Sequence, residues 1–128
     1  MPQLEKLIKK YFELVNSDRF DELFEMFAPD AEFHAPFDYH AQGLDNIKPF
    51  YFMIPDIYPR HVDIPVKIIV SQNQAAVLIE FTGQTAAGVP IAFRGFDWFV
   101  FAGEKIKSLN IFFDVFRISN LISQGGQT

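Results

Sequence analysis

An aspartate surrounded by aromatic residues is the most chemically informative position in this sequence. Asp97 lies between Phe96 and Trp98, and Phe99 follows. An ionised carboxylate without a partner is costly to remove from water, so we expect burial to raise the pKa of Asp97 and keep its proton in place. A neutral carboxylic acid of this kind can donate a hydrogen bond. The alternative is an ion pair between Asp97 and a cation such as Arg94.

Histidines and acids elsewhere provide candidates for proton transfer but form no metal-binding pattern. His34, Asp38, His40 and His61 show no recognised spacing of metal ligands, so we expect no metal. The sequence also lacks a glycine-rich phosphate loop and a Gly-x-Ser-x-Gly nucleophile motif. We therefore expect no cofactor and neither nucleotide chemistry nor serine hydrolysis.

Length and charge limit the classes of partner. The chain has 128 residues, which fits one domain, and 11 Lys and Arg residues against 16 Asp and Glu residues give a net charge of -5. We expect no binding to nucleic acid or to a membrane surface, since both need a basic face. With no cysteine, no signal-peptide pattern and no apolar run long enough to span a bilayer, the sequence predicts a cytoplasmic protein.

Three helices are predicted to open the chain. Apolar residues at helical spacing predict a first helix over 4–15. A second is expected between a cap at Asp18 and a stop at Pro29. A third should begin near Asp45 or Asn46 and end by Pro55.

A different periodicity follows the helices. After a short strand over 31–35 and a loop to position 43, residues alternate between apolar and more polar types. The expected longer strands cover 62–70, 75–86, 90–102 and 105–117. Helices followed by antiparallel strands predict an α+β domain over 1–122, with the helices on one face of a curved sheet and a flexible tail at 123–128.

The strand around Asp97 is apolar on both of its faces. One face would carry Phe93, Asp97, Phe99 and Phe101, and the other Phe96, Trp98 and Val100. A sheet with one wet face would alternate apolar and polar residues, so a second subunit is expected to cover the outer face. The sequence therefore predicts a homodimer.

Four segments have the order and composition of a known family. Residues 7–31 resemble its two opening helices, and Gly-Leu-Asp-Asn-Ile-Lys-Pro-Phe at 43–50 resembles the start of its third helix. Phe-Asp-Trp-Phe-Val-Phe-Ala-Gly-Glu-Lys-Ile at 96–106 and Phe-Phe-Asp-Val at 112–115 resemble its last two strands. The family is that of ketosteroid isomerases, SnoaL-like polyketide cyclases and nuclear transport factor two. The resemblance implies a cone-shaped α+β barrel.

The resemblance also implies roles for two side chains. Tyr11 matches the oxyanion-hole tyrosine of the isomerases, and Asp97 matches their oxyanion-hole aspartic acid. In those enzymes a protonated aspartic acid beside a tyrosine donates a hydrogen bond to a developing enolate. The isomerase base precedes a proline on the first strand, and the matching residue here is Ala35.

Another group must therefore move the proton if the chain is isomerase-like. His34 has a suitable unperturbed pKa, near 6.5, but strand alternation points it away from the side of Ala35. Asp114 resembles the acid/base aspartate on the last strand of SnoaL-like cyclases. Asp38 or His40, on the loop after the first strand, could reach the mouth of a pocket.

These observations predict a cofactor-independent isomerase, cyclase or hydratase for a small apolar carbonyl compound. Tyr11 and Asp97 would stabilise the oxyanion, and Asp114 or His34 would move the proton. The pocket wall is expected to consist of phenylalanines, namely Phe24, Phe33, Phe50, Phe99, Phe101 and Phe113. The alternative, favoured by Ala35, is a module of the same fold that binds a small hydrophobic ligand or forms a dimer without chemistry.

Overall fold

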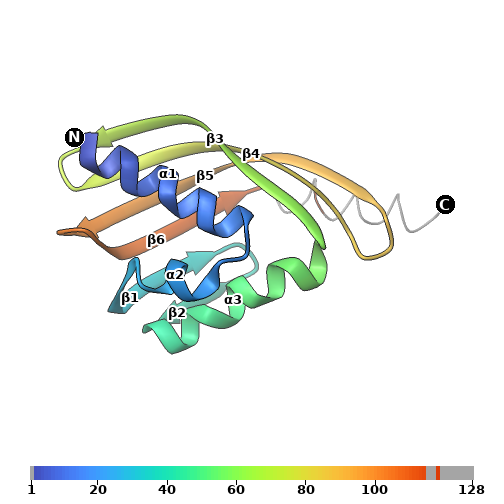
Figure 1. The fold of residues 1–128 in the computed structure, drawn as a ribbon, viewed down its shortest axis with the longest axis horizontal. Coiled ribbons are helices and arrows are strands. Elements are labelled where there is room, and N and C mark those ends of the chain that lie inside the picture. Colours follow the sequence, from blue (N-terminus) through green and yellow to red (C-terminus); the bar gives the residue numbers. More distant parts are fainter. Residues whose placement is uncertain (1, 115–117, 119–128) are drawn as a thin grey trace.

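The computed structural model describes residues 2–114 and 118. Three helices and six strands follow one another as shown in Figure 1. The helices are α1 (Pro2–Asn16), α2 (Phe20–Phe24) and α3 (Leu44–Ile57). The strands are β1 (Phe27–Ala35), β2 (Tyr39–Gln42), β3 (Arg60–Ser71), β4 (Gln74–Gln84), β5 (Pro90–Ala102) and β6 (Lys105–Phe113). The predicted tail at 123–128 lies outside the described residues.

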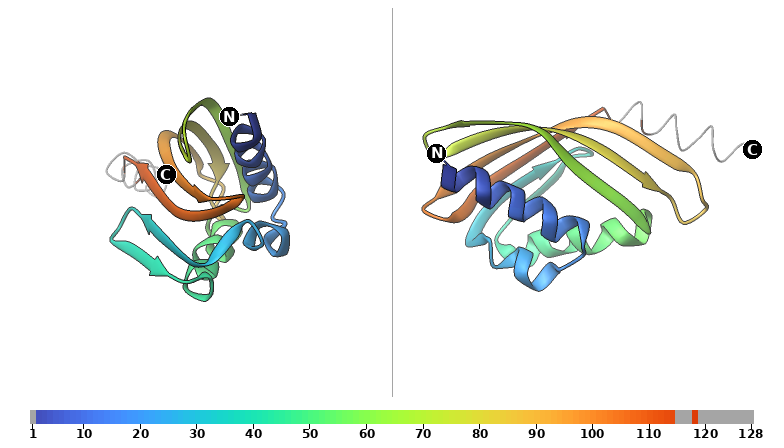
Figure 2. Two further views of the ribbon diagram at one scale, coloured as in Figure 1. Left: turned by 90° about the vertical axis from the view of Figure 1, so that its left-hand side faces the viewer. Right: turned by 45° about the horizontal axis from the view of Figure 1, so that its top comes forward.

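All six strands form one curled sheet. Their order is β2-β1-β6-β5-β4-β3, with β1 and β6 parallel and every other neighbouring pair antiparallel. The sheet curls strongly without closing, and the helices lie on its concave side (Figure 2). This arrangement confirms the predicted α+β fold with helices on one face of a curved sheet.

Helix α1 lies against the sheet through its apolar stripe. Ile8, Tyr11, Phe12 and Val15 recur at helical spacing and are all buried. The rings of Tyr11 and Phe12 meet Phe99 of β5 edge-on, with centroid distances of 5.0 and 6.3 Å. The core under the helix is therefore aromatic and fixes Tyr11 at the inner face of the sheet.

The turn between α1 and α2 differs from the prediction. Asp18 does not cap α2. It adopts a positive φ of 56°, and its Oδ1 lies 2.8 Å from His61 Nε2 on β3. Helix α2 is only five residues long, and the strand that follows it begins at Phe27 and includes Pro29. The side chain expected to start a helix is used instead to join the turn to the sheet.

Two further boundaries of secondary-structure elements differ from the prediction. Helix α3 continues beyond the expected stop and contains Pro55 as well as Pro49. The segment expected to be a loop up to position 43 includes strand β2, which pairs antiparallel with β1. The predicted continuation of the last strand to 117 lies outside the described residues from position 115.

Strand β3 changes face in its middle. The pairing register with β4 shifts between Pro65 and Lys67. Before the shift, Val62 and Ile64 point outward and are 43% and 48% exposed. His61 and Asp63 therefore point inward. This inversion places an acidic side chain on the concave side of the sheet.

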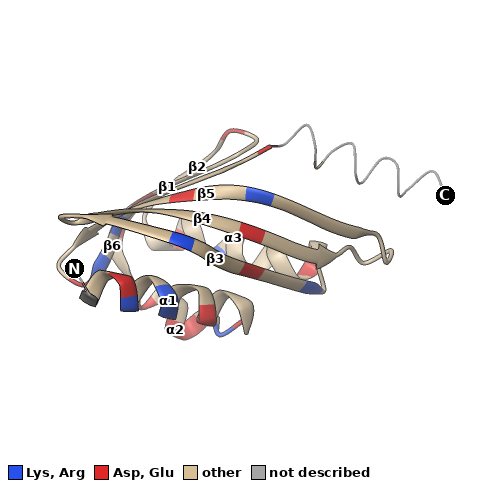
Figure 3. Ribbon diagram, turned by 90° about the horizontal axis from the view of Figure 1, so that it is seen from above, with Lys and Arg blue, Asp and Glu red and all other residues tan. Residues whose placement is uncertain are grey.

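Acidic and basic positions are interspersed over the fold. Red and blue segments alternate along α1 and are spaced along β3, β4 and β5 (Figure 3).

Among the helices that the structure describes, none is both long and apolar enough to cross a membrane.

Gly95 permits the close approach of β6 to β5. A Cβ atom at this position would lie 2.5 Å from the Phe112 carbonyl oxygen and 3.3 Å from Phe113 Cβ. We expect Gly95→Ala to lower the free energy of unfolding by about 1–3 kcal/mol, because the backbone of β6 has to move away. Urea denaturation measures this change.

The control for this prediction is Ala92→Ser, an exposed position on the same strand. Its unfolding free energy should stay within about 0.5 kcal/mol of the wild type. Equal stability of Gly95→Ala and the wild type would contradict the proposed role of Gly95 in strand approach.

Candidate active site

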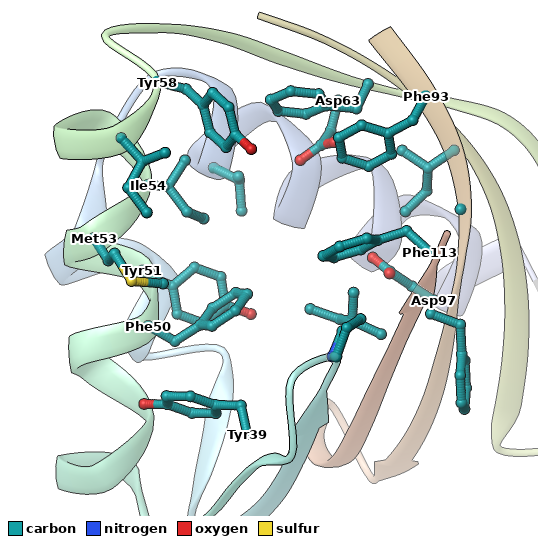
Figure 4. A pocket seen from close by; sticks show the side chains of 18 of the residues that line it. Tyr39, Phe50, Tyr51, Met53, Ile54, Tyr58, Asp63, Phe93, Asp97 and Phe113 are labelled. Carbon is teal, nitrogen blue, oxygen red and sulfur yellow. The ribbon is translucent and has the colours of Figure 1, made fainter. Parts of the chain in front are cut away.

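A cavity of about 420 Å³ opens between α3 and the curled strands. Its wall is formed by the C-terminal half of α1, the loop after β1, helix α3 and the inner faces of β3 to β6. Figure 4 shows Tyr58 and the residues of α3 on one side and Asp97, Phe93 and Phe113 on the other. Most lining side chains are aliphatic or aromatic. The polar lining groups among the described residues belong to Tyr11, Tyr39, Tyr51, Tyr58, Asp63 and Asp97.

Asp97 projects into this cavity from β5 (Figure 4). The residue is 3% exposed, and within the described part of the chain its Oδ1 atom has no hydrogen-bond partner. Burial raises the pKa of Asp97 well above its usual value, and the negative charge of Asp63 raises it further. Asp97 is therefore a neutral acid with a proton available for donation into the cavity.

The alternative ion pair with Arg94 does not form. Arg94 Nη2 lies 2.8 Å from Glu80 Oε1, and both side chains belong to the opposite face of the sheet from Asp97. Strand alternation separates the two residues, because positions 94 and 97 differ by an odd number. The sequence prediction of a buried acid with a raised pKa agrees with this geometry.

The hydroxyl group of Tyr11 forms a hydrogen bond with the hydroxyl group of a second tyrosine, which sequence reasoning missed. The oxygen atoms of Tyr11 and Tyr51 are 2.7 Å apart, and both residues are buried and line the cavity. Burial raises the pKa of both hydroxyl groups, so both keep their protons at neutral pH. One of the two hydroxyls donates to the other, and the acceptor retains its own proton for a ligand.

The helical spacing of α3 contains the signal that would have found Tyr51. Ile47, Tyr51 and Ile54 lie three or four residues apart and form the inward stripe of this helix. A tyrosine on an inward stripe needs a partner for its hydroxyl group. Here the partner comes from α1.

Asp63 is the second cavity carboxyl and was also missed. The residue is half-buried on β3, and its carboxyl group points into the cavity (Figure 4). Burial raises its pKa to about 6, although His61 acts in the opposite direction. Among the described residues, no side chain forms a hydrogen bond or ion pair with this carboxyl group. The inversion of β3 explains why alternation did not reveal it.

The six phenylalanines predicted for the pocket wall fall into two groups. Phe50 and Phe113 line the cavity. The other four predicted wall residues are buried in the core and are not among its lining residues, namely Phe24, Phe33, Phe99 and Phe101. These rings support the polar residues from behind: the Phe99 ring contacts Tyr11, and the Phe33 ring lies 5.8 Å from Tyr51. Sequence could not distinguish the two layers, because both are aromatic.

The predicted proton-transfer residues lie elsewhere. His34 stacks on His40 at 4.2 Å and is aligned with Asn110 and, one strand further, with Trp98, which places it on the outer face. His34, Asp38 and His40 line a second hollow beside the cavity. Asp114 is exposed after the end of β6 and does not line the main cavity. These catalytic roles remain predictions without support from position.

The described residues hold no group of three or more His, Cys, Asp or Glu side chains placed to bind a metal ion. Their cavity offers two carboxyl groups of different pKa and the hydroxyl groups of Tyr11, Tyr51 and Tyr58, whereas the Tyr39 hydroxyl donates to the Asn46 carbonyl oxygen. Its chemistry is therefore hydrogen-bond donation to an oxygen atom and movement of a proton.

Comparisons of the fold give strong matches at low sequence identity. An NTF2-like protein of unknown function from Burkholderia pseudomallei superposes with a TM-score of 0.87 at 16% identity, covering 95% of this chain and 98% of that one. A candidate SnoaL-like polyketide cyclase from Jannaschia gives 0.85 at 16% identity, with 95% and 92% covered. A protein from Catenulispora acidiphila with a ketosteroid isomerase-like fold, in complex with trimethylamine, gives 0.83 at 13%, with 94% and 92% covered.

Sequence comparison supplies the family. No curated protein matches the chain. The profile of the SnoaL-like domain matches residues 8–109, from the first turns of α1 to β6. This range contains Tyr11, Tyr51, Asp63 and Asp97. The chain belongs to the SnoaL-like domain family and has the NTF2-like fold.

Proposed function

We propose that this protein is a cofactor-independent enzyme that moves a proton on a small apolar carbonyl compound, as an isomerase, cyclase or hydratase does. The observation that carries the proposal is Asp97, a buried acid with a raised pKa that faces a cavity. A protonated acid is a hydrogen-bond donor at a place where an ionised one would only accept. The cytoplasmic location expected from the sequence stays a prediction.

The donors are suited to a reaction in which negative charge develops on oxygen. When a proton leaves the carbon next to a carbonyl group, the carbonyl oxygen becomes an enolate oxygen. Asp97 and the Tyr11–Tyr51 pair are held in place by packing, so they need no reorganisation when this charge appears. Donors in an apolar cavity stabilise the enolate more strongly than water-exposed donors do.

The size and lining of the cavity indicate the class of substrate. A volume of about 420 Å³ is in the range of small-molecule sites. Its apolar walls favour a cyclic or polyketide-like carbonyl compound over a charged metabolite. Solved proteins of the same fold from Jannaschia and Sinorhizobium meliloti, named as candidate polyketide cyclases, support this class.

A binding module without chemistry is the second candidate function. Ala35 stands where the resemblance places the isomerase base, and its methyl group cannot accept a proton. In this alternative, the same donors would orient a carbonyl ligand without changing it. The two functions differ in whether the bound ligand loses a proton.

We also propose that a second copy of this chain covers the outer face of the sheet. Exposed apolar side chains gather there on β3, β5 and β6, namely Val62, Ile64, Val66, Ile69, Phe96, Trp98 and Phe112. A two-fold axis places the same patch against itself, so an apolar patch is its own complement. On this face the charges of Arg94 and Glu80 neutralise each other within one subunit.

Deuterium exchange at C2 of 1-tetralone tests the enzymatic proposal. This bicyclic ketone has a proton next to its carbonyl group, and exchange in D₂O is followed by ¹H NMR. We expect the wild type to accelerate exchange, and Asp97→Leu or Tyr11→Phe to reduce the acceleration about 10²–10³-fold, since each removes one donor. Asp97→Asn retains an N–H donor and should lose less.

Binding is measured on the same variants to separate the two candidate functions. A wild type that binds 1-tetralone without accelerating its exchange would support the binding module and reject the enzyme. Undiminished exchange in Asp97→Leu would reject the oxyanion role of Asp97.

The proton on Asp97 also predicts a pH dependence of stability. The folded chain holds this proton more tightly than the unfolded chain, so the stability contributed by Asp97 falls as pH rises above its unfolded pKa. The Asp97→Asn variant does not lose this stability as pH rises, because asparagine does not titrate. Its unfolding free energy relative to the wild type should therefore increase with pH from about 4 upward, approaching about 1.4 kcal/mol per pH unit. Urea denaturation from pH 4 to 7 measures it, and a difference that does not vary with pH would mean that Asp97 titrates normally.

Static light scattering tests the dimer. Phe96→Glu places a charge at the centre of the outer face, and in a dimer two such charges would be buried. We expect the dissociation constant to rise at least about 100-fold. Ala86→Glu, in the exposed β4–β5 turn, is the control with the same charge. A monodisperse monomer of the wild type at micromolar concentration would reject the dimer.

A further inference from the structure

We propose that Asp63 is the acid/base group of this cavity, taking the place of the base that is missing at Ala35. The inference rests on the proposed function, which needs a proton acceptor as well as oxyanion donors. It assigns the role to a strand that the family resemblance did not indicate. Neither sequence periodicity nor the resemblance pointed to this residue.

The position of Asp63 fits direct contact with a ligand. The inversion of β3 turns its side chain toward the concave side, and the carboxyl group faces the same open space as Asp97 (Figure 4). Its neighbours across the sheet are Phe81 and then Phe93, whose rings stack with a centroid distance of 4.6 Å. The carboxyl group therefore lies over an apolar floor, and no Lys or Arg is among the described residues that line the cavity.

Helix α1 fixes the backbone of this residue. The Asp63 N–H donates to Asn16 Oδ1 at 2.8 Å, and Asn16 Nδ2 donates to the Asp63 carbonyl oxygen at 2.9 Å. Both bonds use the main chain, so the carboxylate keeps all of its acceptor capacity for a ligand. Asn16 is thus a positioning residue, and the carboxyl group remains available for proton transfer.

Electrostatics divide the two cavity carboxyls into a base and an acid. Burial raises the pKa of Asp63 to about 6, so it is mostly ionised at pH 7. Burial and the charge of Asp63 hold Asp97 in its neutral form. Pairs of titratable groups with separated pKa values are characteristic of acid/base sites.

The other titratable groups around Asp63 do not block its carboxyl group or replace it as the base. His61 on β3 lowers its pKa but is bound to Asp18 and does not line the cavity. Tyr11 on α1 and Tyr51 on α3 both feel its charge, which raises their own pKa values. Burial also raises the pKa of Tyr58, at the end of α3, which lines the cavity as a neutral hydroxyl.

The proton transfer balances with these groups alone. The Asp63 carboxylate removes a proton from the carbon next to the ligand carbonyl. The C–H electron pair forms the carbon–carbon double bond of the enolate, and the carbonyl π pair moves to its oxygen, which accepts hydrogen bonds from Asp97 and the tyrosine pair. In D₂O the Asp63 carboxyl group exchanges this proton for a solvent deuteron, and delivery of the deuteron to the same carbon gives exchange. In a β,γ-unsaturated ketone, whose enolate extends over the second double bond, delivery to the γ carbon gives isomerisation.

The experiment is the pH–rate profile of 1-tetralone deuterium exchange in Asp63→Asn. We expect the wild-type rate to rise through an inflection near pH 6 and the variant to lose about 10²–10⁴-fold together with the inflection. Asp63→Glu keeps a carboxyl group and should restore part of the rate and an inflection. Asp45→Asn, an exposed carboxyl change at the start of α3, is the matched control and should match the wild type.

The outcomes separate this inference from the function on which it rests. If Asp97→Leu loses activity while Asp63→Asn keeps the wild-type rate and inflection, the assignment of Asp63 is wrong and the proposed function stands. Loss in Asp114→Asn together with a fully active Asp63→Asn would assign the base to Asp114 instead. If the wild type does not accelerate exchange, the proposed function fails and the role of Asp63 with it. Circular dichroism and thermal melting of each variant verify that it is folded.

Discussion

The cost of ionising a carboxyl group in an apolar cavity is the constraint on which this structure depends. Two aspartates face the same space, and no cation among the described lining residues neutralises them. Water solvates a carboxylate far better than phenyl and alkyl groups do, so the protein holds at least one of the two in its neutral form. Asp97 is that residue, because it is almost completely enclosed and one of its oxygens has no hydrogen-bond partner in the part of the chain that the structure describes. Asp63 is less enclosed and ionises first. The difference in burial between two otherwise similar side chains thus creates a donor and an acceptor from one residue type.

The scaffold maintains this difference through contacts along α1 and at its C-terminal end. Its apolar stripe packs on the aromatic core and fixes Tyr11 edge-on to Phe99. At its C-terminal end, Asn16 binds the backbone of β3, and the following turn binds His61 through Asp18. These bonds fix β3 in the register that turns Asp63 inward. The core therefore positions the donors, while the polar contacts after the helix position the second carboxyl. Stability and site geometry depend on the same elements.

Sequence reasoning succeeded where one rule determined the outcome. The buried acid at Asp97 followed from its aromatic neighbours, and the fold followed from helices that precede a run of alternating strands. It failed where two rules competed. Val62, Ile64, Val66, Ile68 and Val70 read as one apolar face, yet the register shift at Pro65 divides them between both faces. Asp63 was hidden by this shift. Asp18 has the residue type of a helix cap but pairs with a histidine 43 positions away, a contact that local propensity does not contain. Phenylalanines of the wall and of the core are the same residue type, so only coordinates separate Phe113 from Phe101.

Among the described residues, the polar side chains that line the cavity are all acidic or phenolic, and this composition would disfavour an ionised acid as a ligand. A fatty acid or another amphiphile with an ionised head would place its charge near Asp63, with no Lys or Arg among the described lining residues to compensate. The hydrophobic tail would gain from the aromatic walls, but the head would meet like charge in a medium of low polarity. Discrimination between a neutral ketone and its carboxylate analogue therefore needs no dedicated recognition residue. This discrimination would follow from the lack of Lys and Arg among the described residues that line the cavity.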